Sequence, residues 1–197
     1  GMSIERVNSP IIGSTDQDEL LYKPTLMEKF PIFKFDNNFD GQFYQRLTNG
    51  LEELDKQTNG LITQQFTTLA QKCRQKSVKL LIGKDPTNKG ISVNTAGLIE
   101  NQYIHINISE DMVKKAMQDP IYVIQQEGNN IPKIKAIPLG NLVAGQENVN
   151  FDDPALIAKC AAYLLFHELF HVNSFLDCQC NTDIYNSFSS NYENLKL

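Results

Sequence analysis

One uninterrupted apolar run near the C-terminal end constrains the fold of this chain most. Asp153 and Pro154 form a helix start in the usual order, a side-chain acceptor followed by a residue whose missing N–H costs nothing there. No Pro or Gly interrupts residues 155–175, and apolar side chains occupy nearly every side of the predicted helix. A helix that is apolar all round is a buried one, so the sequence predicts a helix inside the core of the domain.

The last turns of this predicted helix carry polar residues that are costly to bury. His167 and His171 are four residues apart, so both imidazoles project from one helical face and can bind one ion. Glu168 lies about 100° around the helix from His167, beside such an ion rather than on it. This His-Glu-x-x-His pattern is typical of zinc peptidases, in which the carboxylate accepts a proton from water and zinc polarises the scissile carbonyl. We therefore expect Zn2+ at His167 and His171, with Glu168 as the general base.

A catalytic zinc site needs a third protein ligand and one open position. Three carboxylates that follow the motif are candidates for this ligand: Asp177, Asp183 and Glu193. Asp177 lies six residues past His171, the spacing of the compact zincins, although Ser174 stands where those proteins have Gly. Asp183 lies in a Thr-Asp-Ile-Tyr stretch similar to that of the aspartate-ligand zincins. Glu193 lies 22 residues past His171, in the range of the glutamate-ligand zincins.

Two cysteines after the motif define an alternative from another class of protein. Cys178 and Cys180 would form, together with His167 and His171, a closed His2Cys2 zinc site without an open position. The chain would then be a non-catalytic, zinc-stabilised binding module, and Glu168 would have no task. An inactive zincin that binds a partner through its cleft is a third interpretation, because a site without activity can keep every ligand.

The order of the segments around the motif resembles that of a known family. Paired amphipathic helices come first, followed by a strand and an Asn- and Gly-rich region with a Tyr-Ile-His-Ile strand. The His-Glu-Leu-Phe-His motif and a short tail with Glu193-Asn194 come last. This layout, over roughly residues 36–197, resembles the NleD-type effector metallopeptidases of pathogenic bacteria. The resemblance implies a compact zincin fold, Glu193 as the third zinc ligand, and cleavage of a protein inside a host cell.

The rest of the chain predicts a scaffold of helices and strands. Apolar residues at three- and four-residue steps indicate amphipathic helices over about 39–54 and 61–73. Ser109 precedes a short helix with two acidic residues in its first turn, and Pro120 lies just beyond the end of this helix. The expected helix covers residues 110–118. Together with the motif helix, these segments would cover a sheet.

Alternation and short apolar runs predict the strands. They are expected at 77–82, 102–108 and 121–125, while residues 127–150 are rich in Gly and Pro and indicate loops with one more hairpin. We therefore predict an α+β domain in which helices pack on a small mixed sheet, with the motif helix under its edge strand. His105, on the polar face of the 102–108 strand, is a further candidate near the cleft, although most such histidines are only solvated strand residues.

The first 35 residues lack sustained periodicity and contain three prolines. We expect an extended N-terminal arm over residues 1–35, with a short strand at 32–35, and one metallopeptidase domain over residues 36–197. No stretch reaches the roughly 18 to 20 consecutive apolar residues that cross a bilayer. The first residues lack the charged and then apolar pattern of a secretory signal. Delivery into a host cell by a signal-less route is the localisation that fits the resemblance.

Charge and cysteine content narrow the range of partners. The net charge of −5 and a pI near 5.2 argue against a nucleic-acid-binding surface and against a polybasic membrane patch. Four cysteines are too few for a disulfide-dense scaffold in a chain of 197 residues. The expected partner is therefore a protein or peptide substrate, without nucleic acid or membrane, and the chain is expected to be a monomer.

Overall fold

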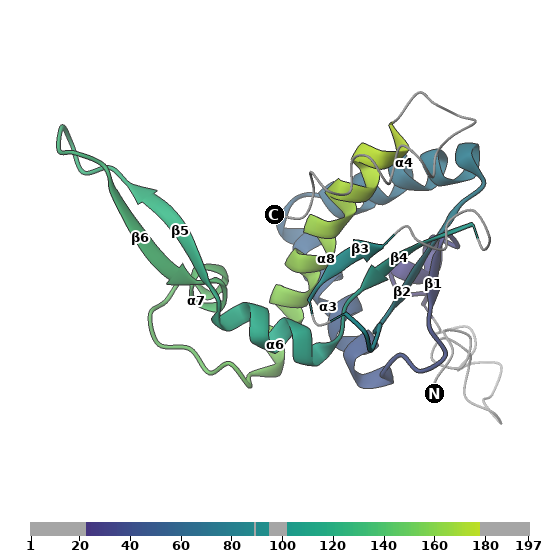
Figure 1. The fold of residues 1–197 in the computed structure, drawn as a ribbon, viewed down its shortest axis with the longest axis horizontal. Helices are drawn as coiled ribbons and strands as arrows, with labels where there is room; N and C mark the ends of the chain where they lie inside the picture. Colours follow the sequence, from purple (N-terminus) through teal and green to yellow (C-terminus); the bar gives the residue numbers. More distant parts are fainter. Residues whose placement is uncertain (1–22, 89, 95–101, 178–197) are drawn as a thin grey trace.

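A four-stranded sheet forms the centre of the structure, a computed structural model that describes residues 23–88, 90–94 and 102–177. Its strands are β1 (Phe33–Phe35), β2 (Lys79–Gly83), β4 (Tyr103–Asn107) and β3 (Ser92–Asn94), in the order β1-β2-β4-β3. The first three run parallel, and β3 lies at the edge, antiparallel to β4 (Figure 1). With helices packed on this mixed sheet, the predicted α+β fold is confirmed.

The register of the strands separates a buried face of the sheet from a more exposed one. One row across the four strands is apolar and buried: Phe35, Ile82, Ile106 and Val93. The neighbouring row must point to the opposite face, because successive side chains of a strand alternate. It consists of Lys34, Leu81, His105 and Asn94, none of which is fully buried. The buried row belongs to the same hydrophobic core as the helices.

Three long helices cover the buried face: α3 (Gly41–Gln57), α4 (Leu61–Lys76) and α8 (Pro154–Leu176). Helix α8 packs most extensively against α3, and Gly50 makes their close approach possible. A Cβ atom at Gly50 would lie 2.0 Å from the carbonyl oxygen of Ala158 and 3.1 Å from the Cβ atom of Ala162. Any larger residue at position 50 would therefore push α3 and α8 apart.

The helix starts that the sequence predicts are present. The Asp153 side chain accepts a hydrogen bond from the backbone N–H of Ala155 at 3.1 Å, with Pro154 at the first helical position of α8. The Ser109 hydroxyl accepts a hydrogen bond from the backbone N–H of Met112 at 3.4 Å. This caps α6 (Glu110–Gln118), whose bounds are those that the sequence predicts. Local capping chemistry thus places both helices along the chain.

A two-stranded hairpin extends away from this body (Figure 1). It is formed by β5 (Pro120–Gln125) and β6 (Lys133–Pro138), antiparallel, with Ile124 opposite Ile134 and Tyr122 opposite Ala136. The strand expected at 121–125 is present as β5, but the 127–150 region supplies only its partner β6 and no separate hairpin among the described residues. The six-residue helix α7 (Leu139–Ala144) follows directly and was not predicted, because less than two turns of helix show no periodicity.

Residues just before β1 belong to the core rather than to an arm. The short 3-10 helix η1 (Met27–Lys29) and strand β1 bury Leu26, Met27, Ile32 and Phe33 against the helices. The boundary predicted at residue 35 therefore lies too late, and the domain already includes these positions. The short strand expected at 32–35 is present as β1, but the three-residue helix η1 carries too short a pattern to be recognised in a segment interrupted by prolines.

Helix α8 is long and apolar enough to cross a membrane, judged by length and composition alone. The core helix of a soluble protein meets the same criterion, and no other helix in the described ranges does. In this structure α8 packs against α3, α4, α6, α7 and β3. Its apolar character therefore has a structural explanation within the domain.

Candidate metal and catalytic site

The C-terminal half of α8 presents the motif residues beside a flank that α4 covers. Phe166, Leu169, Phe170 and Asn173 of α8 face Gln65, Phe66 and Leu69 of α4 around a narrow gap. Further along, the Lys72 ammonium donates to the Asn173 amide oxygen at 3.3 Å and lies 2.6 Å from Asp177 Oδ1. Helix α4 thus holds the end of α8 that carries the motif.

His167 and His171 lie side by side on the neighbouring flank. Their ring centroids are 5.1 Å apart, and the ring planes are nearly perpendicular, at 87°. His167 is exposed and His171 is half-buried. Burial and the nearby His167 both lower the pKa of His171 below its ordinary value, which favours a neutral ring. A neutral imidazole is the form that binds a metal ion.

Glu168 is the one acidic side chain of the described residues that is buried, with an exposed fraction of 9%. Burial raises the pKa of its carboxyl group to about 7, because the charged form loses its hydration. A carboxyl group without a nearby cation is rare inside a protein. A pKa close to the working pH lets this group both accept and donate a proton.

Strand β3 lies against the helix that carries the motif. It is one of the two edge strands of the described sheet, it contacts α8, and its single described neighbour is the antiparallel strand β4. The buried Val93 anchors it to the core. Its outer edge pairs with no other described strand, and an unpaired strand edge is a place where an extended peptide can bind.

An aromatic surface lies next to His167. Tyr163 and Phe170 have exposed fractions of 48% and 54%, and the Phe170 ring packs edge-on against Phe166 at 5.0 Å. Residues 163, 167 and 170 follow one another at helical spacing, so they share one stripe of α8. The prediction of a helix buried on all sides is therefore wrong for this stripe, which is apolar and exposed.

The candidates for a third zinc ligand lie mostly beyond the residues that the structure describes. Asp183, Glu193, Cys178 and Cys180 all fall in the segment 178–197, outside the described residues. Asp177 is described, caps the end of α8 and pairs with Lys72 rather than with a histidine. Among residues 23–88, 90–94 and 102–177, no three His, Cys, Asp or Glu side chains gather closely enough to hold a metal ion.

His105 lies on the face of the sheet that points away from α8. Its neighbours Ile104 and Ile106 are fully buried in the core that includes α8, so His105 must point to the other side. Hydrogen bonds from Thr87, and to a smaller extent the proximity of His105, lower the pKa of Asp85. His105 therefore belongs to the surroundings of the 84–88 loop and not to the motif.

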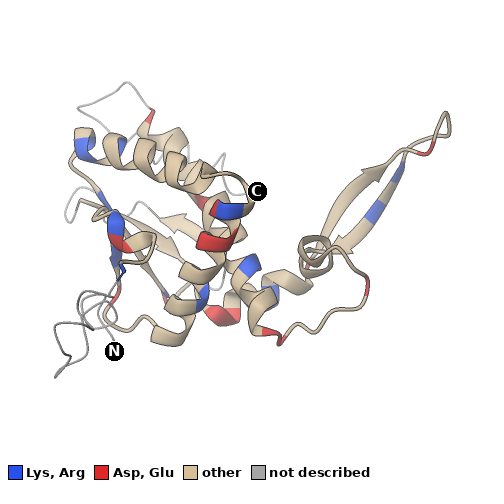
Figure 2. Cartoon of the chain, turned by 180° about the vertical axis from the view of Figure 1, so that it is seen from behind, with Lys and Arg blue, Asp and Glu red and all other residues tan. Residues whose placement is uncertain are grey.

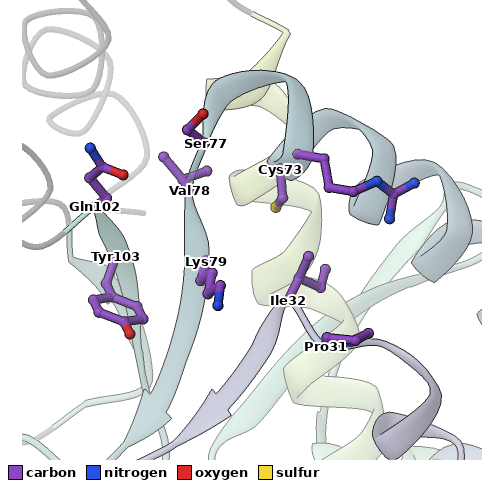
Figure 3. A pocket seen from close by; sticks show the side chains of 9 residues that line it. Pro31, Ile32, Cys73, Ser77, Val78, Lys79, Gln102 and Tyr103 are labelled. Atoms are coloured by element: carbon purple, nitrogen blue, oxygen red, sulfur yellow. The ribbon is translucent and has the colours of Figure 1, made fainter.

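A cavity of about 500 Å³ lies at the start of β2 and β4, beside the end of α4 (Figure 3). Its lining includes Arg74, Lys79 and Tyr103 but none of the motif residues. Cys73 also lines it, and burial raises the pKa of its thiol to about 12, which keeps it protonated and unreactive. The cavity and the motif therefore lie at different places in the structure. The motif is the candidate active site, because among the described residues it alone combines paired imidazoles with a buried carboxyl group.

Comparisons with protein-family models, with curated proteins and with solved structures gave no match. The assignment of a function therefore depends on the side chains of α8 and on what surrounds them. Sequence reasoning predicts His167, Glu168 and His171 as site residues, and this stays a prediction. It missed the exposed Tyr163 and Phe170, because exposure of an aromatic residue depends on which helix face the neighbouring elements leave uncovered.

Proposed function

We propose that this chain is a zinc-dependent endopeptidase in which His167 and His171 bind Zn2+ and Glu168 is the general base. The observation that carries the proposal is Glu168, a buried carboxyl group with a pKa raised to about 7, on the same helix as two histidines whose rings lie side by side. Burial of a carboxyl group lowers stability, so a protein usually retains such a group where it has a function. Proton transfer at neutral pH is such a function.

The two histidines fit zinc in type and in position. Zinc accepts neutral imidazole nitrogens at about 2.0 to 2.1 Å, and two rings one helical turn apart, with centroids 5.1 Å apart, can converge on one ion. Zinc in such a site polarises a peptide carbonyl and makes a water molecule more acidic. Glu168 would accept a proton from the attacking water and would donate it to the leaving amine.

Two surfaces beside the motif would position the peptide. The open edge of β3 offers backbone N–H and C=O groups to an extended chain, which would place the scissile bond next to α8. Phe170 and Tyr163 provide an apolar wall for a side chain of the substrate. An extended protein or peptide segment is therefore the substrate class that this arrangement favours.

We assign the third ligand to Glu193, on the basis of its spacing and of the resemblance to NleD-type effectors. The same resemblance suggests a protein of a host cell as the substrate and a role as a bacterial effector. The competing ligands Asp177 and Asp183, and the pair Cys178 and Cys180, are separated from Glu193 by metal analysis.

The zinc content of purified protein tests the ligand set. We expect about one zinc per chain in the wild type and a sharp loss in Glu193→Ala, whereas Asp177→Ala and the double variant Cys178→Ser/Cys180→Ser keep the metal. Loss in the cysteine variant alone would establish the closed His2Cys2 site instead. A wild type that takes up no zinc, even when zinc is supplied, would refute the assignment of His167 and His171.

Hydrolysis of a library of quenched fluorescent peptides tests the catalytic role. Glu168→Gln keeps the size of the side chain but removes the base, so activity should fall by a factor of about 10² to 10⁴ with unchanged zinc content. Glu147→Gln, on an exposed residue outside α8, is the matched control and should retain full activity. Substantial hydrolysis by Glu168→Gln would contradict the role of this residue.

A further inference from the structure

The β5–β6 hairpin exposes large apolar side chains to an unusual degree. Tyr122, Ile124, Ile131 and Ile134 have exposed fractions of 70%, 74%, 84% and 73%. Every other large apolar side chain of the described residues is more protected, the next being Phe170 at 54%. An isolated two-stranded hairpin is only marginally stable in water, and a concentration of exposed apolar surface marks an interaction site.

Its two faces differ in chemistry. The register places Tyr122, Ile124, Ile134 and Ala136 on one face, which carries no charge. Lys133 and Lys135 project from the other face of β6, opposite Gln125 and Val123. These lysines are the only charged residues of the two strands (Figure 2). Neither of them forms an ion pair with another described residue.

Strand β6 also has an unpaired edge and a hollow beside it. Its sheet contains only β5 and β6 among the described residues, so one edge of β6 has no strand neighbour. A cavity of about 370 Å³ runs along residues 135–138 and is completed at the end of α7 by Asn141, Leu142, Gly145, Gln146 and Glu147. This hollow offers room for an apolar side chain next to the open edge.

We propose that β6 binds an extended segment of a partner protein as an added strand, and that this segment alternates acidic and apolar residues. Its acidic side chains would face Lys133 and Lys135, and its apolar side chains would lie against Ile134 and in the hollow beside α7. Backbone hydrogen bonds supply affinity in this mode of recognition, and the alternate side chains supply specificity. The hairpin binds this segment independently of zinc chemistry on α8.

Charge excludes a second copy of the chain as the preferred occupant. Two β6 edges that pair antiparallel around Ile134 bring Lys133 of one chain opposite Lys135 of the other, on the same face. Like charges that lie directly opposite across a strand pair are destabilising. Lysines on an edge strand are indeed a common protection against self-pairing. With an acidic segment, the same two lysines would form favourable electrostatic contacts with carboxylates of the partner.

Fluorescence anisotropy of labelled octapeptides with the full chain tests the proposal. An octapeptide that alternates Glu and Val should bind at least tenfold more tightly than one that alternates Lys and Val, and added salt should weaken this binding. The variant Lys133→Glu/Lys135→Glu should reverse the preference, a gain of binding that an unfolded protein does not show. Lys56→Glu/Lys115→Glu changes the net charge equally at exposed positions elsewhere and should leave the preference unchanged.

Four outcomes would overturn the proposal. Failure of both peptides to bind, or equal binding of both, would remove the acidic segment as the occupant. Sedimentation that shows a wild-type dimer, dissociated by Ile134→Asp, would make a second copy the occupant. Co-sedimentation with phosphatidylcholine–phosphatidylglycerol vesicles that Ile134→Asp abolishes, without peptide binding, would make the hairpin a lipid anchor.

Discussion

Helix α8 and the β5–β6 hairpin each place side chains in surroundings that are unusual for them: a carboxyl group is buried in α8, and apolar side chains are exposed on the hairpin. Helix α8 buries Glu168 among apolar side chains, and the hairpin surrounds Ile124 and Ile134 with water. Both segments are apolar in composition, so composition alone does not tell them apart. Their burial distinguishes them, because α8 packs against five other elements whereas the two strands of the hairpin pack mainly against each other.

This contrast indicates where each segment acts. A buried carboxyl group is costly and is usually retained for chemistry, whereas exposed apolar side chains are usually retained for binding. The helix is thus the candidate for catalysis and the hairpin the candidate for recognition. Variants that change stability in one segment and not in the other would sharpen this distinction.

A large loss of stability is expected for Gly50→Ala. The new Cβ atom would lie 2.0 Å from a backbone oxygen of α8, so the two helices must move apart. We expect the free energy of unfolding to fall by about 3 kcal/mol or more, at the upper end of the range for overpacked cores. Urea unfolding measures this, and Gly90→Ala, where a Cβ atom meets open space, should change little. Equal effects of the two variants would show that α3 and α8 are not closely packed.

Truncation of one apolar side chain in each segment tests the comparison directly. Leu165→Ala removes a fully buried side chain of α8 and should lower the free energy of unfolding by about 2 to 5 kcal/mol. Ile134→Ala removes an exposed side chain of the hairpin and should change it by less than about 0.5 kcal/mol. Both values come from urea unfolding. A large loss in Ile134→Ala would mean that the hairpin contributes to the folded core.

The pH dependence of stability tests the burial of Glu168 in metal-free protein. Its pKa is about 7 in the folded chain and 4.5 as the ordinary value, so the folded state binds more protons between these pH values. The free energy of unfolding should therefore fall as the pH rises from 4.5 to 7, by up to about 3 kcal/mol, and then level off. Urea unfolding in chelator should show Glu168→Gln more stable than wild type at pH 8 and equal to it at pH 4.5.

His171 must be separated from this effect because it acts in the opposite direction. Its pKa is lowered in the folded chain, so its contribution to stability rises with pH up to its ordinary value of 6.5. The difference between wild type and Glu168→Gln at each pH removes the contribution that both proteins share. A difference that does not change with pH would contradict a raised pKa for Glu168.

The smallest effect is expected at the contact between α4 and the end of α8. Lys72→Met removes the ion pair with Asp177 and the hydrogen bond to Asn173. Asp177 is well exposed, so the loss should be about 0.5 to 1 kcal/mol and should shrink in 1 M salt. Thermal unfolding at low and high salt measures this. A loss that salt does not change would place the role of Lys72 in the packing of its aliphatic stem.

Local signals in the sequence predicted where a helix begins when the residues at its own start determine that position. Ser109 with two acidic residues after it fixed the start of α6, and Asp153-Pro154 fixed that of α8. Helix α7 and η1 were missed because they are too short for periodicity. The pairing of β1 with β2 joins residues far apart in the chain, and no local pattern records it.

The candidate site was predictable only in part for the same reason. The spacing of His167 and His171 places them on one face of any helix, so their proximity follows from the sequence. The exposure of Phe170 depends on where α4 ends its contact with α8, which is a property of the whole fold. The position of His105 behind the sheet likewise follows from which face the helices cover.

The close crossing at Gly50 and Ala158 has a consequence for folding kinetics. The main contact of α3 lies more than one hundred residues ahead of it in the chain, so the core closes only after a long loop has been ordered. During synthesis, α3, α4 and the sheet must wait with exposed apolar faces until α8 has left the ribosome. The motif residues lie on α8, the last helix of the described residues, so formation of the site and completion of the core become a single late event.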